Sequence, residues 1–201
     1  MNAAIVKETA SSKTSSPIEE ILLRHPIIAS IKDQDGLNAV IDVQCPVVFV
    51  LFGSVLNIAQ NVKKLKDDGR VVFVDIDLID GFSNNPVVID FLKEHTLADG
   101  VLSSKAAMVK YSKSLGLFAI HRIFLVDSFS YNNLPKQVKL SGADAVEILP
   151  GCIPRVISWV REDIDLPIIA GGLVCDKQDV VSALGAGAIA IASSNRQVWK
   201  M

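Results

Sequence analysis

Cysteine and histidine are scarce in this chain of 201 residues, which limits the chemistry that it can support. The three cysteines, Cys45, Cys152 and Cys175, are too few and odd in number for a disulfide framework. The three histidines are scattered along the chain without the spacing of metal ligands. The sequence therefore predicts neither structural disulfides nor a metal site.

Long apolar runs are also lacking. Half of the residues are hydrophobic, but no uninterrupted run approaches the ~20 residues that a membrane span needs. The N-terminus is interrupted by Lys7, Glu8 and Lys13 and has no apolar region typical of a signal peptide. We expect a soluble cytoplasmic protein with no membrane partner.

Strong charge of one sign is absent too, and aromatic residues make up only 6% of the chain. A formal net charge of −2 excludes a strongly basic nucleic-acid-binding protein by bulk charge, but it leaves a local basic patch open. The candidate clusters are Lys63, Lys64, Lys66 and Arg70 in one segment, and Lys136 with Lys139 in another. The first cluster is also typical of a solvated helix face.

The chain does contain a repeated pattern of short apolar runs, each followed by a helical segment. Residues 1–17 are polar and without periodicity, so we expect a flexible tail, and helix spacing begins at Ile18–His25. Eight apolar runs follow, at Pro26–Ile31, Pro46–Phe52, Arg70–Asp75, Gly100–Leu102, Phe118–Leu125, Ala145–Leu149, Pro167–Ala170 and Ala188–Ala192. Apolar strands separated by helices are typical of a parallel sheet buried on both faces.

Eight such repeats predict an α/β fold, a compact (β/α)8 TIM-type barrel that occupies residues 18–201 as a single domain. The short polar connections near Asp33–Gln44 indicate that one or two outer helices are irregular. The alternative is an open doubly wound sheet, but no Gly-x-Gly-x-x-Gly turn follows the first strand.

The last two apolar runs end in small polar groups that are suited to phosphate. Gly171 and Gly172 follow one run, and Ser193 and Ser194 follow the other. Glycines let an anion approach backbone N–H groups, and we expect the serine hydroxyls to lie beside the N-terminus of a final helix. The loops after strands seven and eight form the usual phosphate site of a (β/α)8 barrel, so we predict one here. A plain turn and an N-cap are the structural alternatives.

Polar residues also stand at the ends of the other predicted strands, and in a barrel these ends meet at one mouth. The predicted pocket residues are Lys32, Asp75, Asp77, Ser103, Lys105, Asp127 and Glu147. Structural alternatives remain for three of them, because Lys32 and Lys105 could be charges at helix starts or pair with acids, and Asp127 could cap a helix. Arg122 lies inside an apolar run, where an unpaired charge is costly, so we expect it to have an acidic partner. No nucleophile–base pair is recognisable, which favours a binding pocket with no catalytic residues.

Several segments taken together resemble the glycerol-3-phosphate responsive antiterminator family, the regulators of glycerol uptake operons. The matching residues are 26–32, 74–81, 100–105, 122–128, 146–151 and 167–174, and the resemblance covers about residues 18–201. It implies a barrel without enzymatic activity that needs no cofactor and binds glycerol 3-phosphate as its effector. It also implies that the protein acts on a leader mRNA so that transcription passes a terminator.

By this resemblance, Gly171, Gly172, Ser193 and Ser194 would hold the phosphate, and Asp75, Asp77 and Glu147 would line the glycerol end. The RNA partner rests on the resemblance alone, because composition shows no RNA-recognition signature. The alternative function is a phosphosugar isomerase, aldolase or synthase on the same barrel, with Glu147 or Asp75 as acid or base. A homo-oligomer is left open.

Overall fold

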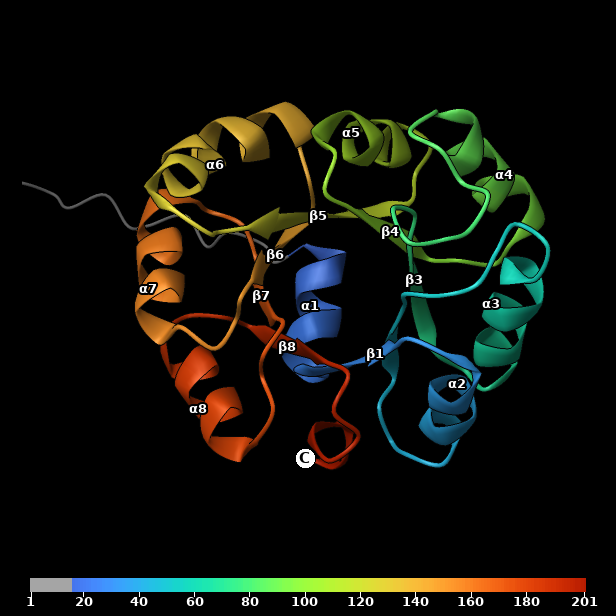
Figure 1. The fold of residues 1–201 in the computed structure, drawn as a ribbon, viewed down its shortest axis with the longest axis horizontal. Helices are drawn as coiled ribbons and strands as arrows, with labels where there is room; N and C mark the ends of the chain where they lie inside the picture. Colours follow the sequence, from blue (N-terminus) through green and yellow to red (C-terminus); the bar gives the residue numbers. More distant parts are fainter. Residues whose placement is uncertain (1–15) are drawn as a thin grey trace, which may run out of the picture.

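Eight parallel strands close into a barrel in the computed structural model of the protein, which describes residues 16–201 (Figure 1). The strands are β1 (Ile27–Ile31), β2 (Val47–Val50), β3 (Val71–Asp75), β4 (Gly100–Ser103), β5 (Phe118–Phe124), β6 (Ala145–Leu149), β7 (Ile168–Gly171) and β8 (Ala190–Ser193). Each strand pairs with the next one along the chain, and β8 pairs with β1 to close the ring. The predicted (β/α)8 fold is confirmed.

Helices form an outer ring around the strands (Figure 1). They are α2 (Gln34–Ile41), α3 (Ile58–Asp67), α4 (Val87–His95), α5 (Ala106–Ser114), α6 (Ser128–Ser141), α7 (Pro154–Asp163) and α8 (Lys177–Gly185), whereas α1 (Pro17–Arg24) is not part of this ring. Helices α2 to α8 follow β1 to β7, but β8 is followed only by the short 3-10 helix η1 (Val198–Lys200). The final α-helix expected directly after Ser194 is therefore not formed. Among residues 16–201, no helix is long and apolar enough to cross a membrane.

Two helix starts differ from those expected, and the local hydrogen bonds explain both. The sequence predicts a helix that opens at Gly53 and Ser54, but α3 begins at Ile58. The later start arises because the backbone of Gly53–Val55 pairs with Asp80 of the neighbouring loop. Helix α6 begins at Ser128 because Asp127 accepts a hydrogen bond from the Ser130 N–H and forms a capping box. The spacing of residues in the sequence alone predicts a helix that begins near Asn133.

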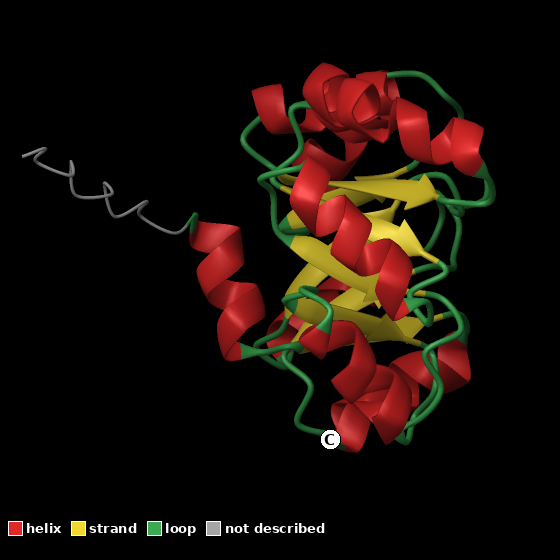
Figure 2. Cartoon of the chain, turned by 90° about the vertical axis from the view of Figure 1, so that its left-hand side faces the viewer, coloured by secondary structure: helices red, strands yellow, loops and turns green. Residues whose placement is uncertain are grey.

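Helix α1 covers the N-terminal end of the barrel, the end from which the strand arrows point away (Figure 2). It begins at Pro17 and is capped by Ser16, so the last two residues of the predicted tail belong to the ordered fold. Residues 1–15, the rest of that predicted tail, lie outside the described residues. Ile18 and Leu22 are buried against the apolar side chains inside the barrel, which closes this end.

The barrel interior changes from apolar to polar along its axis. Side chains of alternate strand residues point inward, and the layers nearest α1 contain Phe49, Phe73 and Ile120. The next inward position on β5 is Arg122, and its partners come from the inward positions of β3 and β6. Polar chemistry is thereby confined to the C-terminal mouth.

Candidate functional site

A cavity of about 270 Å³ opens at the C-terminal mouth of the barrel. Its lining includes Gly172 and Ser194 from the loops after β7 and β8, Lys32 after β1, and the inward side chains of Arg122 and Glu147. The structure thus brings together residues from both parts of the predicted site. The volume suits a ligand of a few heavy atoms, because cavities for drug-sized ligands start at about 300 Å³.

Backbone N–H groups are available on this cavity. Gly172 and Leu173 both adopt positive φ, +70° and +57° respectively, so the loop after β7 turns sharply over the cavity. Within residues 16–201, the N–H groups of Gly172, Leu173 and Ser194 donate to no protein acceptor. Lys32 is exposed and has no ion-pair partner in the same range. Unused N–H donors next to a lysine form a site for a small anion.

The two serines expected to bind phosphate together have different surroundings. The Ser193 hydroxyl is buried; it donates to the Val174 carbonyl at 2.7 Å and accepts from the Asn195 N–H at 3.1 Å. This hydroxyl joins the loop after β8 to the loop after β7. Ser194 is exposed because it lies just beyond the end of β8 at the mouth of the barrel, and its hydroxyl faces no competing partner in the described chain. Of the pair, Ser194 is the one available to a ligand.

Gly171 serves the site through Glu147. It occupies an inward position at the end of β7, and a Cβ added there would collide with the Glu147 carboxylate. The lack of a side chain at position 171 therefore leaves room for that carboxylate. Gly171 itself is not among the residues that line the cavity, whereas Gly172 is.

Arg122 is held between two acids at the base of the cavity. Its Nε donates to Glu147 Oε2 at 2.6 Å, and its Nη1 donates to Asp75 Oδ2. The side chains of Asp75 and Glu147 are 1% and 3% exposed, and of the three residues Arg122 and Glu147 line the cavity. The expected acidic partner of Arg122 is thus found twice. Arg122 was not predicted as a site residue, although its charge inside an apolar run was the signal that could have placed it there.

Asp75 and Glu147 face one guanidinium, and their burial shifts the protonation of both carboxylates. Burial raises the pKa of Asp75 from 3.8 to about 6, even though the nearby Arg122 charge opposes the shift. Burial also raises the pKa of Glu147, again against the effect of Arg122. The cluster therefore binds protons more readily than two ordinary carboxylates would.

Asp77 has separate partners from Asp75, because β3 ends at Asp75 and the chain turns there. Its carboxylate accepts hydrogen bonds from the Ser103 hydroxyl at 2.9 Å and the Ser104 N–H at 2.7 Å, and it pairs with Lys105 Nζ at 3.0 Å. Burial alone would raise the pKa of Asp77, but these hydrogen bonds lower it below its ordinary value. Asp77, Ser103 and Lys105 form a structural cluster between the ends of β3 and β4, and none of them lines the cavity.

Asp127 caps α6 and is exposed outside the cavity. Asp127 was predicted as a pocket residue, but the structure shows the capping role that the sequence left open as the alternative. Burial is minimal here, and the hydrogen bonds from Ser130 hold the pKa of Asp127 below its ordinary value, as an N-cap carboxylate requires.

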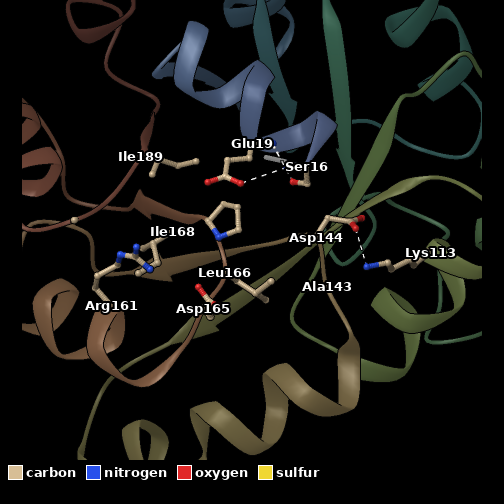
Figure 3. A pocket seen from close by; sticks show the side chains of 12 residues that line it. Ser16, Glu19, Lys113, Ala143, Asp144, Arg161, Asp165, Leu166, Ile168 and Ile189 are labelled. Carbon is tan, nitrogen blue, oxygen red and sulfur yellow. Dashed lines mark hydrogen bonds and ion pairs between the residues drawn. The ribbon is translucent and has the colours of Figure 1, made fainter. Parts of the chain in front are cut away.

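A second, larger hollow of about 510 Å³ lies at the opposite end of the barrel, beside α1 (Figure 3). Of its polar side chains, Lys113 pairs with Asp144, and the Glu19 carboxylate accepts a hydrogen bond from the Ser16 backbone N–H. Chemistry in (β/α)8 barrels gathers at the carboxyl ends of the strands, which are the far end from this hollow. The smaller mouth cavity, with its unused donors, is therefore the candidate site.

A (β/α)8 barrel with a small polar cavity between the loops after β7 and β8 is the class that this fold and site define. Residues 27–199 match the glycerol-3-phosphate responsive antiterminator family, and the chain belongs to this family. The resemblance noted in the sequence is confirmed.

Three similar proteins illustrate the relationship. The uncharacterized protein YgcP of Escherichia coli (strain K12) is 46% identical over 185 residues, which cover 92% of this chain and 97% of that protein. The crystal structure of a glycerol uptake operon antiterminator regulatory protein from Listeria monocytogenes is 29% identical with a TM-score of 0.83, over 86% of this chain and 94% of that one. The structure of a glycerol uptake operon antiterminator-related protein from Thermotoga maritima is 34% identical with a TM-score of 0.78, over 87% and 98%.

Proposed function

We propose that the protein binds glycerol 3-phosphate in the mouth cavity and, with this effector bound, acts on the leader mRNA of a glycerol-use operon so that transcription passes a terminator. It does so as a regulator without catalysis. The single observation that carries the ligand part is the meeting of unused backbone N–H groups at Gly172 and Ser194 with Lys32 on one cavity.

In this proposal the phosphate lies against the loops after β7 and β8. The N–H groups of Gly172, Leu173 and Ser194 and the Ser194 hydroxyl donate to its oxygens, and the Lys32 ammonium compensates its charge. These donors are preorganised, since the Ser193 hydroxyl already ties the two loops together.

The glycerol end of the ligand lies toward the base of the cavity, which Glu147 and Arg122 line. A carboxylate accepts hydrogen bonds from hydroxyls, and a guanidinium donates to them, so this pair suits a polyol. Asp75 does not line the cavity, and it positions Arg122 through a hydrogen bond.

An enzyme on the same barrel would need an acid or base ready at the mouth. The two candidates, Glu147 and Asp75, are both engaged by Arg122, and this favours a binding site over a catalytic one. Family membership favours a regulator for the same site.

The ligand part is tested by calorimetric titration with glycerol 3-phosphate, glycerol and inorganic phosphate. We expect glycerol 3-phosphate to bind more tightly than either fragment, because only it reaches both ends of the cavity. Equal binding of phosphate and glycerol 3-phosphate would contradict the proposed polyol contacts.

The regulatory part is tested by a mobility shift of the glycerol-operon leader transcript with and without the effector. We expect glycerol 3-phosphate to increase RNA binding, because a ligand that holds the mouth loops shifts the population toward the binding-competent state. Turnover of a phosphosugar with no effect on RNA would contradict the proposal in favour of the enzyme alternative.

A further inference from the structure

Basic residues are concentrated on one wall of the barrel. Residues 100–143 contain six lysines and arginines and one acidic residue, Asp127, in a chain whose formal net charge is −2. Helices α5 and α6 lie within this segment and contain four lysines and no acidic residue. Each of the other six α-helices contains at least one acidic residue. The wall formed by α5 and α6 is therefore the basic side of an acidic protein.

Three of the four lysines on this wall are not neutralised. Lys110, Lys136 and Lys139 are exposed, and their side chains form no ion pair or hydrogen bond within residues 16–201. Two of the three lysines of α3, the other candidate cluster, differ in this respect. Lys63 pairs with Asp67 at 2.6 Å and Lys66 pairs with Asp99 at 2.7 Å, while Lys64 donates to the Asn38 amide oxygen. Most of the positive charge of α3 is therefore locally cancelled, whereas most of that on α5 and α6 is not.

The two helices of this wall lie side by side (Figure 1). Lys113 near the end of α5 donates to the carbonyl of Gly142, the C-cap of α6, at 2.8 Å, so the ends of the helices are in register. Three acidic side chains that border the wall bind other residues on it: Asp90 accepts from the Tyr111 hydroxyl, Asp144 pairs with Lys113, and Asp163 accepts from the Tyr131 hydroxyl. None of these acids pairs with Lys110, Lys136 or Lys139, so the three ammonium groups can contact an external anion.

Exposed aromatic side chains border the same wall. Phe124 at the end of β5, Phe129 at the start of α6 and Trp159 of α7 are 51%, 75% and 40% exposed. They are the most exposed aromatic side chains among residues 16–201. Lysines that neutralise phosphates, next to aromatic rings on which unpaired bases stack, are the elements of single-stranded RNA recognition.

We propose that the wall defined by Lys110, Lys136, Lys139 and Phe129 is the surface on which RNA docks. The lysines contact backbone phosphates, and Phe129 stacks on an unpaired base. The ligand cavity and the wall share β5, which places Arg122 in the cavity and ends at Phe124 beside the wall. This inference rests on the proposed function, because it assumes that the partner is RNA.

The test compares two variants with the same change in charge. K110E/K136E/K139E alters the wall, and K64E/K93E/K200E alters exposed lysines on other parts of the described chain. Fluorescence anisotropy measures binding of each full-length variant to the labelled leader transcript, with glycerol 3-phosphate present and over a range of KCl concentrations. Unchanged melting temperature and unchanged binding of glycerol 3-phosphate verify that both variants are folded.

We expect the wall variant to bind RNA about 10-fold more weakly or worse. Its plot of log affinity against log salt should be shallower by about 2, because three phosphate contacts on a single strand contribute about 0.7 each. F129A should weaken binding about 10-fold without changing that slope, because stacking involves no counterion release.

The outcomes separate the two proposals. If wild type binds the transcript and the wall variant matches the control variant, the docking surface is wrong and the proposed function stands. If wild type binds no transcript with glycerol 3-phosphate present, the proposed function fails and the docking surface fails with it.

Discussion

Gly171 and Glu147 are in direct contact across the adjacent ends of β7 and β6, and the Glu147 carboxylate occupies the space that a side chain at position 171 would fill. The same carboxylate accepts the 2.6 Å hydrogen bond from Arg122. A glycine that sequence analysis assigned to phosphate is thus required by the charged cluster beneath the cavity.

This contact predicts that Gly171→Ala destabilises the fold. The added methyl group forces Glu147 away from Arg122, and overpacking of this kind costs about 1–3 kcal/mol of unfolding free energy. Urea unfolding at neutral pH measures the change.

The matched control is Gly185→Ala at the end of α8, where an added Cβ meets no atom within 4 Å. We expect it to leave the stability unchanged or to raise it by up to about 1 kcal/mol, because alanine restricts the unfolded chain. Equal stability of the two variants would show that Glu147 moves aside without cost.

The raised pKa of Asp75 predicts that the free energy of unfolding depends on pH in a specific way. Its pKa is raised from 3.8 to about 6 in the folded state, so the unfolded state loses this proton first as pH rises. The contribution of Asp75 to the free energy of unfolding therefore falls between about pH 4 and pH 6 and is fully lost above that range. Asp75→Asn removes this titration, and from pH 4 to pH 7 its stability should rise relative to wild type by about 3 kcal/mol.

Asp77→Asn is the control with the opposite sign. The pKa of Asp77 is lowered, so the stability that it contributes is present above its ordinary pKa and is lost as pH falls below it. Relative to wild type, Asp77→Asn should lose stability as pH rises through that range. Urea unfolding of the three proteins at a series of pH values measures both effects, and parallel profiles for the two variants would contradict the assignment.

The two serines after β8 should separate stability from ligand affinity. Ser193→Ala leaves the Val174 carbonyl and the Asn195 N–H without their shared partner and should cost about 1–3 kcal/mol of unfolding free energy. Ser194→Ala changes an exposed residue and should alter stability by less than about 0.5 kcal/mol. Calorimetry with glycerol 3-phosphate should show weaker binding for Ser194→Ala, and a destabilised Ser194→Ala with unchanged affinity would reverse the two roles.

The barrel could be predicted because its signal is repeated eight times along the chain. Each strand is a short apolar run, and five of the seven helices that follow a strand start within about two residues of their predicted positions, as α5 does at Ala106 and α8 at Lys177. The exceptions, α3 and α6, depend on a bridge between loops and on a capping box, and spacing of apolar residues contains neither.

The site could be predicted as a set of strand ends but not as a set of partners. Asp75 and Asp77 share parity, yet the chain turns after β3, so Asp75 binds Arg122 and Asp77 binds Lys105. The sequence predicts the same role for the neighbouring serines, although Ser193 is the buried last residue of β8 and Ser194 lies exposed just beyond it. Such choices depend on contacts between strands that are distant in sequence, whereas the list of strand ends depends on the sequence alone.

The most direct test of the phosphate site is calorimetric titration of Gly172→Asp with glycerol 3-phosphate. Gly172 has φ of +70° and lines the cavity, so an aspartate there places a carboxylate where the phosphate binds. Gly69→Asp is the matched control, because Gly69 has φ of +78°, lies away from the cavity and has space for a side chain. We predict that wild type and Gly69→Asp bind glycerol 3-phosphate and that folded Gly172→Asp does not. Binding by Gly172→Asp with wild-type affinity would contradict the central claim.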